Sequence, residues 1–420
     1  MTKYIYKSHK LTVFLFILAP YFFACTDEAF VTELGEDTFL HPYDTSTTEI
    51  VFRTYQIPPT LGGHGDLYFG KKSVYQMPLT LFKVATFSEL ITSSMLVDSA
   101  HFEMTLDTSK TDTVLDEMPL TLGYFESDTL YSELESNYSN IDWIPSEYPE
   151  LSSFTAVDTS TGLTHVRFRV DSSFVASLTD TANEEQLFIV EAAENLSSML
   201  AFHSSESTKN QPVFRIFYHT APDTVADTTA VPIDSTVTVN IVDDLSIVIP
   251  PPLNATHFDT TLSYAGAAAG LRTLIRADLE SLGIPTIAVV IAANLILPVA
   301  HSASVLASES SAEVQIFTLS DTVDSWLWGE SVLEEDPFDH LIVAGTISPR
   351  AAISDSSFIL DVKDVLQSII SERVVEDSSI TNLGLKLMMV SSTSVFDYVA
   401  LRTGDSAGTA PRLEILYALP

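Results

Sequence analysis

The sequence contains one segment twice, and this repeat constrains the fold more strongly than any other feature. Residues 202–218 and 401–417 align without a gap at an offset of 199 (401 − 202 = 199). Four aligned columns are identical, among them a proline and the final tyrosine. An internal duplication means that one structural unit is used twice.

The repeat extends through both halves of the chain. Residues 127–132 correspond to residues 320–325 at an offset of 193 (320 − 127 = 193). The offset rises towards the C-terminus because four residues, 179–182, are replaced by eleven, 371–381. We therefore expect two units of one fold, with two unrelated β domains of similar alternation as the alternative.

The N-terminus has the features of an export signal. Three lysines precede an apolar run over residues 11–23, which is followed by Ala24 and Cys25. The run is short and sharply ended for a membrane span. It resembles the signal of bacterial lipoproteins, which implies removal of residues 1–24 as a signal peptide and acylation of Cys25. An ordinary signal peptide or a membrane anchor is the alternative.

Cys25 is the single cysteine, so its acylation would leave no thiol for a disulfide. Each buried methylene of an acyl chain adds roughly 0.8 kcal/mol to membrane binding, so several chains give lasting anchorage. Asp27 and Glu28 follow, and this acidic pair resembles the surface-export signal of Bacteroidetes lipoproteins, with a solvated spacer as the alternative. We expect an outer-membrane lipoprotein on the periplasmic or the surface-exposed face.

Acidic residues dominate the charge. The formal net charge is −36, and loss of the three lysines in residues 1–24 gives −39 (−36 − 3 = −39). Such a surface repels phosphate backbones, so we expect no nucleic-acid partner. Charged residues are only 18% of the chain and hydrophobic ones 46%, which indicates a packed protein.

Short segments of alternating apolar and polar residues predict an all-β fold. Residues 102–107, 166–170 and 412–415 show this alternation, which is typical of antiparallel sheets with one buried face. We expect two tandem antiparallel β-sandwich or jelly-roll domains. Apolar residues at helical spacing over residues 362–370 predict one short helix, with a weaker counterpart around Phe174 and Leu178.

Composition divides the chain into successive regions. We expect an acylated tether (25–45), a first domain (46–220), a polar linker (221–238) and a second domain (239–420). Residues 284–300 form the strongest apolar run after the signal. The run is shorter than a membrane span and rich in β-branched residues, so we expect two buried strands there.

The second unit has an ordered series of features, which are an Arg-containing strand (271–279), an Ala-Asn-Leu-Ile-Leu strand (293–297), Trp326 with Trp328, a strand and helix from residue 358, an Asn-Leu-Gly segment (382–384) and a closing strand (411–417). The series resembles the DNRLRE-type domain of secreted and surface bacterial proteins, related to carbohydrate-binding modules. The resemblance implies a non-catalytic jelly-roll module, which in some members binds acidic polysaccharide. With a charge of −39, an anionic glycan would need a local basic groove or bridging calcium.

No motif points to catalysis, so we predict no catalytic residues and no enzyme activity. The chain has no metalloprotease, serine-hydrolase or phosphate-loop motif. Asp321 and Asp324 offer hard oxygen ligands for Ca²⁺, although solvated loop acids are the simpler interpretation. A pair of hydrolase carboxylates cannot be identified among 56 acidic residues.

Three tryptophans are candidate ligand-binding residues. A flat aromatic ring can cover the apolar face of a sugar. Trp326 and Trp328 have the same strand parity, so they would share one side of an extended segment, and Trp143 has tyrosine neighbours in the first unit. Packing in the core is the alternative for all three.

The sequence therefore predicts a cell-envelope lipoprotein that acts as a non-catalytic binding or structural module. Its partners would be the membrane, through the lipid anchor, and a polysaccharide or an envelope protein. A polysaccharide-active hydrolase and a structural subunit of an envelope complex are the alternatives.

Overall fold

The computed structural model describes most of the chain from residue 41 to residue 420. The ranges within this span that it does not describe are 85–86, 88–90, 92–94, 115–117, 126–130, 153–154, 179–185, 221–233, 254–257, 280, 320–335, 337, 339–348, 377–382 and 405–408. The predicted tether and signal therefore lie largely outside the described residues.

The first domain is an 11-stranded antiparallel sheet that curls into two facing layers. Its strands are β3 (Asp66–Lys72), β4 (Tyr75–Val84), β5 (Met95–Thr105), β6 (Leu120–Phe125), β7 (Glu150–Ser152), β8 (Thr155–Asp158), β9 (His165–Val170), β10 (Gln186–Ala192), β11 (Met199–His203), β12 (Val213–Thr220) and β13 (Asp234–Ile249), with helix α2 (Ser172–Leu178). The long β13 joins the layers because it pairs with β12 over its first half and with β4 over its second half.

The second domain is built in the same way, again from 11 strands. Its strands are β1 (His41–Thr47), β2 (Ile50–Gln56), β14 (Leu262–Gly266), β15 (Leu271–Ala277), β16 (Val289–Pro298), β17 (Glu313–Thr318), β18 (Arg350–Ser354), β19 (Ser357–Asp361), β20 (Leu383–Ser391), β21 (Tyr398–Arg402) and β22 (Arg412–Leu419), with α3 (Lys363–Glu376) and the short 3-10 turns η3 (His301–Ala303) and η4 (Glu309–Ser311). The predicted all-β class with two sandwich-like halves is confirmed, and each half has a helix.

Corresponding strands recur at the offsets found in the sequence. Strands β11 and β21, and strands β12 and β22, are separated by 199 residues (398 − 199 = 199; 412 − 213 = 199). Strands β6 and β17 are separated by 193 (313 − 120 = 193). At the same offset of 193, β13 corresponds to β1 followed by β2 (234 − 41 = 193).

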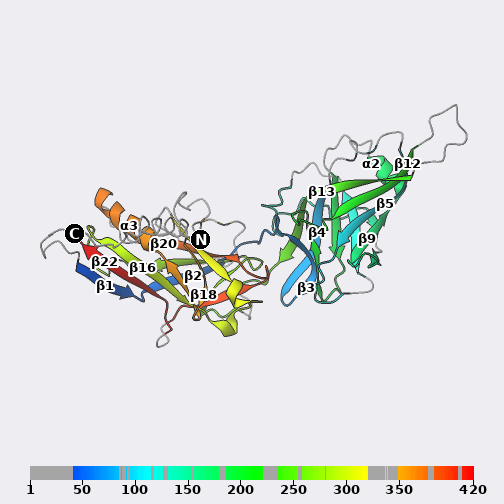
Figure 1. Ribbon diagram of the computed structural model, residues 1–420. Coiled ribbons are helices and arrows are strands. Elements are labelled where there is room, and N and C mark those ends of the chain that lie inside the picture. The colour runs from blue at the N-terminus through cyan, green and yellow to red at the C-terminus, as the bar shows by residue number, and fades with distance from the viewer. Residues whose placement is uncertain are drawn as a thin grey trace, which may run out of the picture.

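The two repeats exchange their first strands. Strand β1 pairs with β22 and β2 pairs with β15, so the start of the first repeat completes the second domain. Reciprocally, β13 begins the second repeat but pairs with β12 and β4 of the first domain. Figure 1 shows β1 and β2 in one half of the molecule and β3, β4 and β13 in the other.

This exchange places the domain boundaries differently from the prediction. The first domain spans residues 66–249, and the second joins residues 41–56 to residues 262–419. The predicted linker 221–238 lies between β12 and β13, which pair as neighbours within one domain, and its last five residues belong to β13. Segments 57–65 and 250–261 connect the domains instead.

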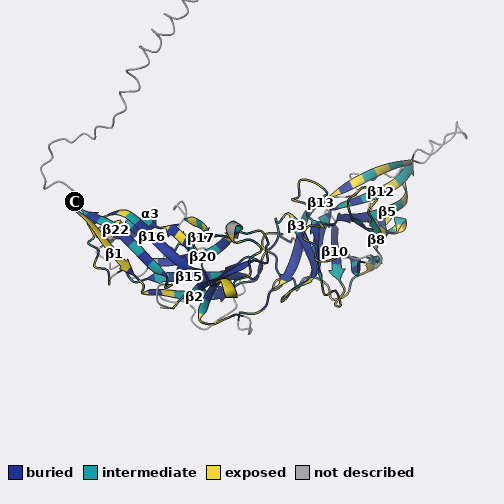
Figure 2. Cartoon of the chain, turned by 60° about the horizontal axis from the view of Figure 1, so that its bottom comes forward, coloured by how far each residue is buried: buried dark blue, intermediate teal, exposed yellow. Residues whose placement is uncertain are grey.

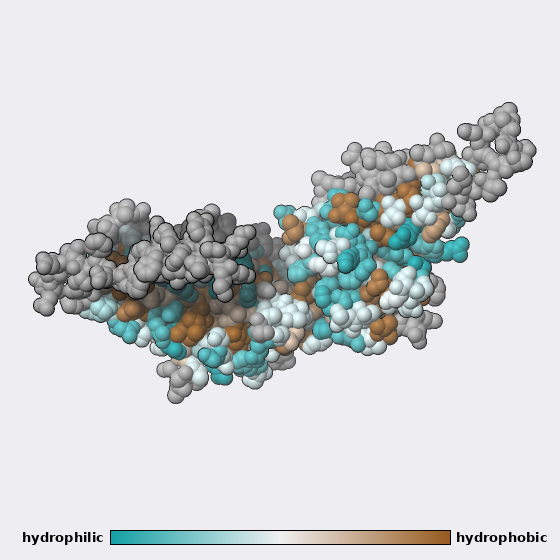
Figure 3. Space-filling model, in the orientation of Figure 1, coloured by the Kyte–Doolittle hydropathy of each residue, from teal (hydrophilic) through white to brown (hydrophobic). Residues whose placement is uncertain are grey.

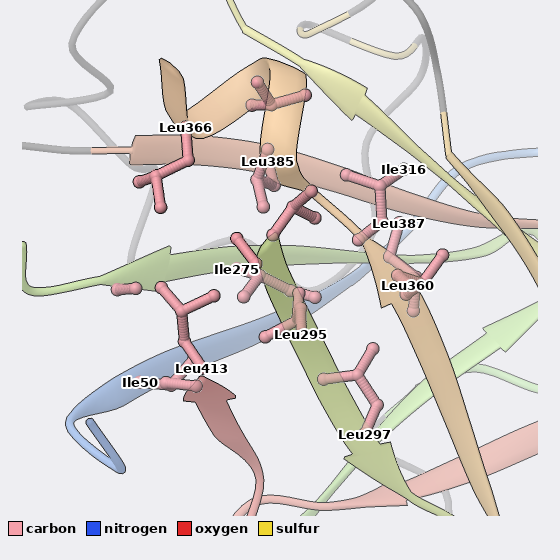
Figure 4. Close-up of a cluster of buried hydrophobic side chains, with 14 of the residues drawn as sticks. Ile50, Ile275, Leu295, Leu297, Ile316, Leu360, Leu366, Leu385, Leu387 and Leu413 are labelled. Atoms are coloured by element: carbon pink, nitrogen blue, oxygen red, sulfur yellow. The ribbon is translucent and has the colours of Figure 1, made fainter. Parts of the chain in front are cut away.

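Each domain has its own apolar interior, and the exchanged strand contributes to it. Ile50 of β2 lies in the core of the second domain with residues of the second repeat such as Ile275 and Leu413 (Figure 4). Ile50 is 8% exposed, and burying such a side chain contributes about 1.5–3 kcal/mol. Figure 2 shows the contrast between these buried strands and β1, much of which is exposed at the sheet edge.

A third apolar cluster joins the domains. It combines Tyr68, Tyr75 and Met77 of the first domain with residues of the second that include Tyr264 and Phe396. The Phe396 ring lies 5.0 Å from that of Tyr68 and 5.2 Å from that of Tyr75, in edge and tilted geometries that favour aromatic pairs. The two domains therefore pack against each other as well as sharing strands.

The described part of the surface has no continuous apolar face in the view of Figure 3, where hydrophobic residues form small separate groups. No described helix is both long and apolar enough to cross a membrane. The apolar run over residues 284–300 contains one strand, β16, rather than the two predicted, because its first residues form the turn that leads into β16.

Candidate ligand-binding site

A slot opens in the second domain where two strands diverge. Strand β2 pairs with β15 along residues 271–277. Strand β14 pairs with β15 at one position, between Gly266 and Leu271, and pairs with β21 along its whole length. The backbone of β14 at Tyr264 lies against the face of the β2–β15 pair, because the side chains of Thr54 and Thr273 both hydrogen-bond it. Residues 52–54 of β2 and residues 262–264 of β14 line the same cavity.

The cavity has a volume of about 320 Å³, at the lower end of the range for small-ligand pockets. Its walls combine apolar and aromatic side chains with hydroxyl and charged groups. The lining residues are Phe52, Arg53, Thr54, Leu253, Phe258, Asp259, Thr260, Leu262, Ser263, Tyr264 and Thr403. This mixture suits a ligand with an apolar ring face and several hydrogen-bonding groups.

Two threonine hydroxyls bridge β2, β15 and β14 beside the slot. The Tyr264 N–H donates to Thr54 Oγ1 (2.9 Å), which lies 3.3 Å from Thr273 Oγ1. Thr273 Oγ1 donates in turn to the Tyr264 carbonyl (2.8 Å). Side-chain hydroxyls thus satisfy the backbone groups of β14 at the point where the ladder stops.

The first domain has the same bridge at the corresponding place. The Tyr68 N–H donates to Ser246 Oγ (2.9 Å), which lies 3.1 Å from Thr80 Oγ1. Tyr68 and Tyr264 are separated by 196 residues (264 − 68 = 196), as are the starts of β3 and β14 (262 − 66 = 196). The two slots are therefore equivalent positions of the repeat, although their contents differ.

Carboxyl groups occupy the slot of the first domain, which we call the acid cluster (Glu133, Glu206, Asp243 and Asp244). Asp244 is only 1% exposed, and the Ser205 N–H donates to its Oδ2 (2.7 Å). Burial, together with the nearby Glu206 carboxylate, raises the pKa of Asp244 to about 8. Asp244 is thus mainly a neutral acid at pH 7.

Glu133 reaches the cluster from the segment that follows β6. Backbone N–H groups of Asp244 and Gly63 hydrogen-bond its carboxylate, but burial and the charge of Glu206 outweigh them and raise the Glu133 pKa. A Cβ on Gly62 would lie 1.8 Å from the Glu133 carbonyl oxygen, so only glycine allows this approach. The Glu133 segment therefore packs directly against residues 62–63 and Asp244, at the place in the first domain that corresponds to the open slot.

Trp143 belongs to a layer that covers the outside of the first-domain sheet. Its ring lies 6.1 Å from that of Phe125 and 6.2 Å from that of Tyr131, and it packs half-buried on an apolar cluster that includes Leu81 and Ile189. This placement favours the packing interpretation over an exposed sugar platform.

The other predicted site residues lie outside the described residues. These are Cys25, Trp326, Trp328, Asp321 and Asp324. Next to the tryptophan segment, Asp336 pairs with the fully buried Lys386 (2.5 Å), accepts a hydrogen bond from the Tyr55 hydroxyl (3.0 Å), and is followed by Phe338 stacked edge-on against Tyr55. The buried ion pair with Lys386 thus holds Asp336, which lies between β17 and β18 in the sequence, on the outer face of β20.

One group of possible metal ligands is present among the described residues, formed by Asp66, Asp107 and His203. The Lys110 ammonium pairs with both carboxylates of this group, and Tyr68 donates to Asp66 (3.4 Å). The Lys110 side chain therefore already offsets part of the negative charge of the two carboxylates.

Sequence reasoning missed both slots. Arg53 and Asp259, the charged residues of the open slot, belong to no motif, and they lie 206 residues apart (259 − 53 = 206). The alignment of β2 with β13 in the repeat could have pointed to the two slots. It does so only once the strand exchange is known, because the exchange places these strands in different domains.

Comparisons with known proteins assign no family. No protein-family model matches the sequence, and no curated protein matches it. Among solved structures, "Structure of infectious bursal disease virus Gx strain" aligns with 90% of this chain and 76% of that chain at 12% identity and a TM-score of 0.14. A likeness of this size carries no argument about fold or function.

Proposed function

We propose that the protein is a non-catalytic binding module of the cell envelope that is anchored through acylated Cys25 and captures a glycan in the open slot of the second domain. The observation that carries the proposal is the slot itself. Phe52, Phe258 and Tyr264 give it aromatic surface, while Thr260 and Thr403 bring hydroxyls. Sugar rings need both kinds of contact, since one face is apolar and the edge carries hydroxyls.

The slot contains a basic residue, which the acidic chain would need in order to bind an anionic glycan. Arg53 supplies a cation in a protein with a formal net charge of −36, and Asp259 supplies an acceptor for sugar hydroxyls. The side chain of Asp259 is held in place because Thr261 donates to its Oδ1 through N–H (2.8 Å) and Oγ1 (2.7 Å). Two charged groups of opposite sign favour a polar, hydroxylated ligand.

The arrangement of the domains suits attachment at one end. Strand β1, which follows the tether, lies at the end of the molecule opposite to the tip formed by β5 and β12 (Figure 1). An anchor at Cys25 would therefore hold the second domain near the membrane and direct the first domain outwards.

Binding of the soluble chain from Thr26 to Pro420 to a broad glycan panel tests this function. We expect retention of one glycan class, and at least a tenfold weaker Kd for the double variant Arg53→Ala/Asp259→Ala. The matched control is Arg412→Ala/Glu414→Ala, which breaks a half-buried pair on β22 (2.6 Å) and also leaves the net charge unchanged. Retention of no glycan, or equal loss in both double variants, would refute glycan capture by the slot.

A further inference from the structure

Both segments that cross between the domains run from one slot to the other. Residues 57–65 start directly after β2, which lines the open slot, and include Gly62 and Gly63 beside Glu133 of the acid cluster. Residues 250–261 start directly after β13, which carries Asp244, and include Phe258 and Asp259 of the open slot. The reciprocal exchange therefore connects the two sites twice by covalent chain.

Gln56 clamps these crossings together at the centre of the molecule. It is 1% exposed, and its amide nitrogen donates to the carbonyls of Pro251 and Ala269 (both 2.8 Å). Its amide oxygen accepts a hydrogen bond from the Leu253 N–H (2.8 Å). Every hydrogen bond of this side chain therefore joins the end of β2 to the other crossing or to the turn before β15.

Ile57, which follows Gln56, is also held in place by close contacts. The Ile57 N–H donates to the Gly270 carbonyl (2.9 Å), and a Cβ on Gly270 would lie 1.8 Å from the Ile57 oxygen. A displacement of residues 57–65 is thus transmitted to β2 and to the turn between β14 and β15. Strand β2 lines the open slot, and the turn directly follows β14, which also lines it.

Asp244 can produce such a displacement because three loops surround it. The carboxylates of Glu206, after β11, and Glu133, after β6, act on Asp244 directly, and Tyr131 is buried beside it. Asp243, the preceding residue of β13, is ion-paired to Lys83 of β4 (3.5 Å), and His64 of the 57–65 crossing lies near Glu206. A negative charge on Asp244 would repel Glu133 and Glu206 across a poorly solvated site. The loop carrying Glu206 is hydrogen-bonded to the 57–65 crossing, since the Ser204 N–H donates to the Gly65 carbonyl (3.2 Å).

We propose that the acid cluster regulates the open slot, with loss of the Asp244 proton loosening the 57–65 crossing and weakening ligand binding in the second domain. The effect on affinity rests on the proposed function, whereas the conformational linkage does not. Burial raises the pKa of Asp244 to about 8, so the change falls in a mildly alkaline range. By linkage, a ligand in the slot must favour the protonated form of Asp244 to the same degree.

A fluorine probe in the slot tests the linkage without any ligand. In the soluble chain from Thr26 to Pro420, Thr403→Cys provides the single thiol, which is labelled with a trifluoromethyl group and followed by ¹⁹F NMR from pH 6 to pH 10. We expect the resonance to shift with a midpoint near pH 8. The shift should vanish in Asp244→Asn and persist in Asp243→Asn, the neighbouring control.

The outcomes separate the linkage from the proposed function. A resonance that is constant with pH, or one that still titrates in Asp244→Asn, would overturn the linkage even if a glycan binds. Failure of every glycan to bind would leave the ¹⁹F result readable. Thr260→Cys, labelled in the same way at another lining position, repeats the test if Thr403→Cys does not fold.

Discussion

Residues at equivalent places of the two repeats differ in chemistry because the repeats have diverged. Asp244 and Phe52 occupy equivalent places, because Ser246 and Thr54, two residues further on, both accept the hydrogen bond from the bridging tyrosine N–H. One place holds a buried carboxyl group and the other a ring that lines a cavity. The sequence shows both residues, but it cannot show that one is buried among acids and the other opens to solvent.

Asp244 should make the stability of the first domain fall as the pH rises. Its pKa is about 8 in the folded protein and about 3.8 when unfolded, so between these values only the folded state keeps the proton. The stabilising contribution is complete below about pH 4 and lost by about pH 8. At 1.36 kcal/mol per pKa unit, the difference is on the order of 6 kcal/mol.

Asp244→Asn should remove most of this dependence, because an amide is neutral throughout and still accepts the Ser205 N–H. Urea unfolding at pH 5 and at pH 8.5 measures the effect. We expect Asp244→Asn to be more stable than the parent at pH 8.5 and to exceed it by a much smaller margin at pH 5, with Asp243→Asn as the control. An equal pH dependence in the parent and Asp244→Asn would contradict this assignment.

At the scale of elements, alternation and helical spacing predicted most of the architecture. The helix expected over residues 362–370 is α3, and its weaker counterpart is α2. The sheet that the first strand of each repeat joins could not be predicted. Since β1–β2 and β13 are corresponding segments with similar alternation, the sequence pattern does not show which domain each one joins.

The exchange predicts which domain responds when a first strand is weakened. Ile50→Ala in β2 should lower the free energy of unfolding of the second domain by about 2–4 kcal/mol, since Ile50 lies in that core. Ile241→Ala in β13 is the reciprocal control and should weaken the first domain. Hydrogen exchange resolved by peptide checks this through amides of β20 and β10. A loss of protection in β10 caused by Ile50→Ala would indicate unexchanged domains.

At the scale of the whole molecule, exchanged strands and a shared apolar cluster join two sandwich-like domains. A chain of two independent units on a linker would allow each domain to move and diverge separately. Here the crossings 57–65 and 250–261 connect equivalent slots, so a change at one slot has a physical route to the other. The lipid anchor, the envelope location and the glycan remain proposals that rest on the sequence signal and the open slot.

The exchange of first strands is the central claim, and cysteine pairs test it most directly. Tyr43 of β1 pairs with Tyr417 of β22, and their rings stack at 5.4 Å, whereas unexchanged repeats would pair Tyr43 with Tyr218 of β12, the equivalent of Tyr417 (417 − 199 = 218). In the soluble chain from Thr26 to Pro420, mild oxidation should form an intramolecular disulfide in Tyr43→Cys/Tyr417→Cys and none in Tyr43→Cys/Tyr218→Cys. A disulfide formed only in the second pair would contradict the exchange.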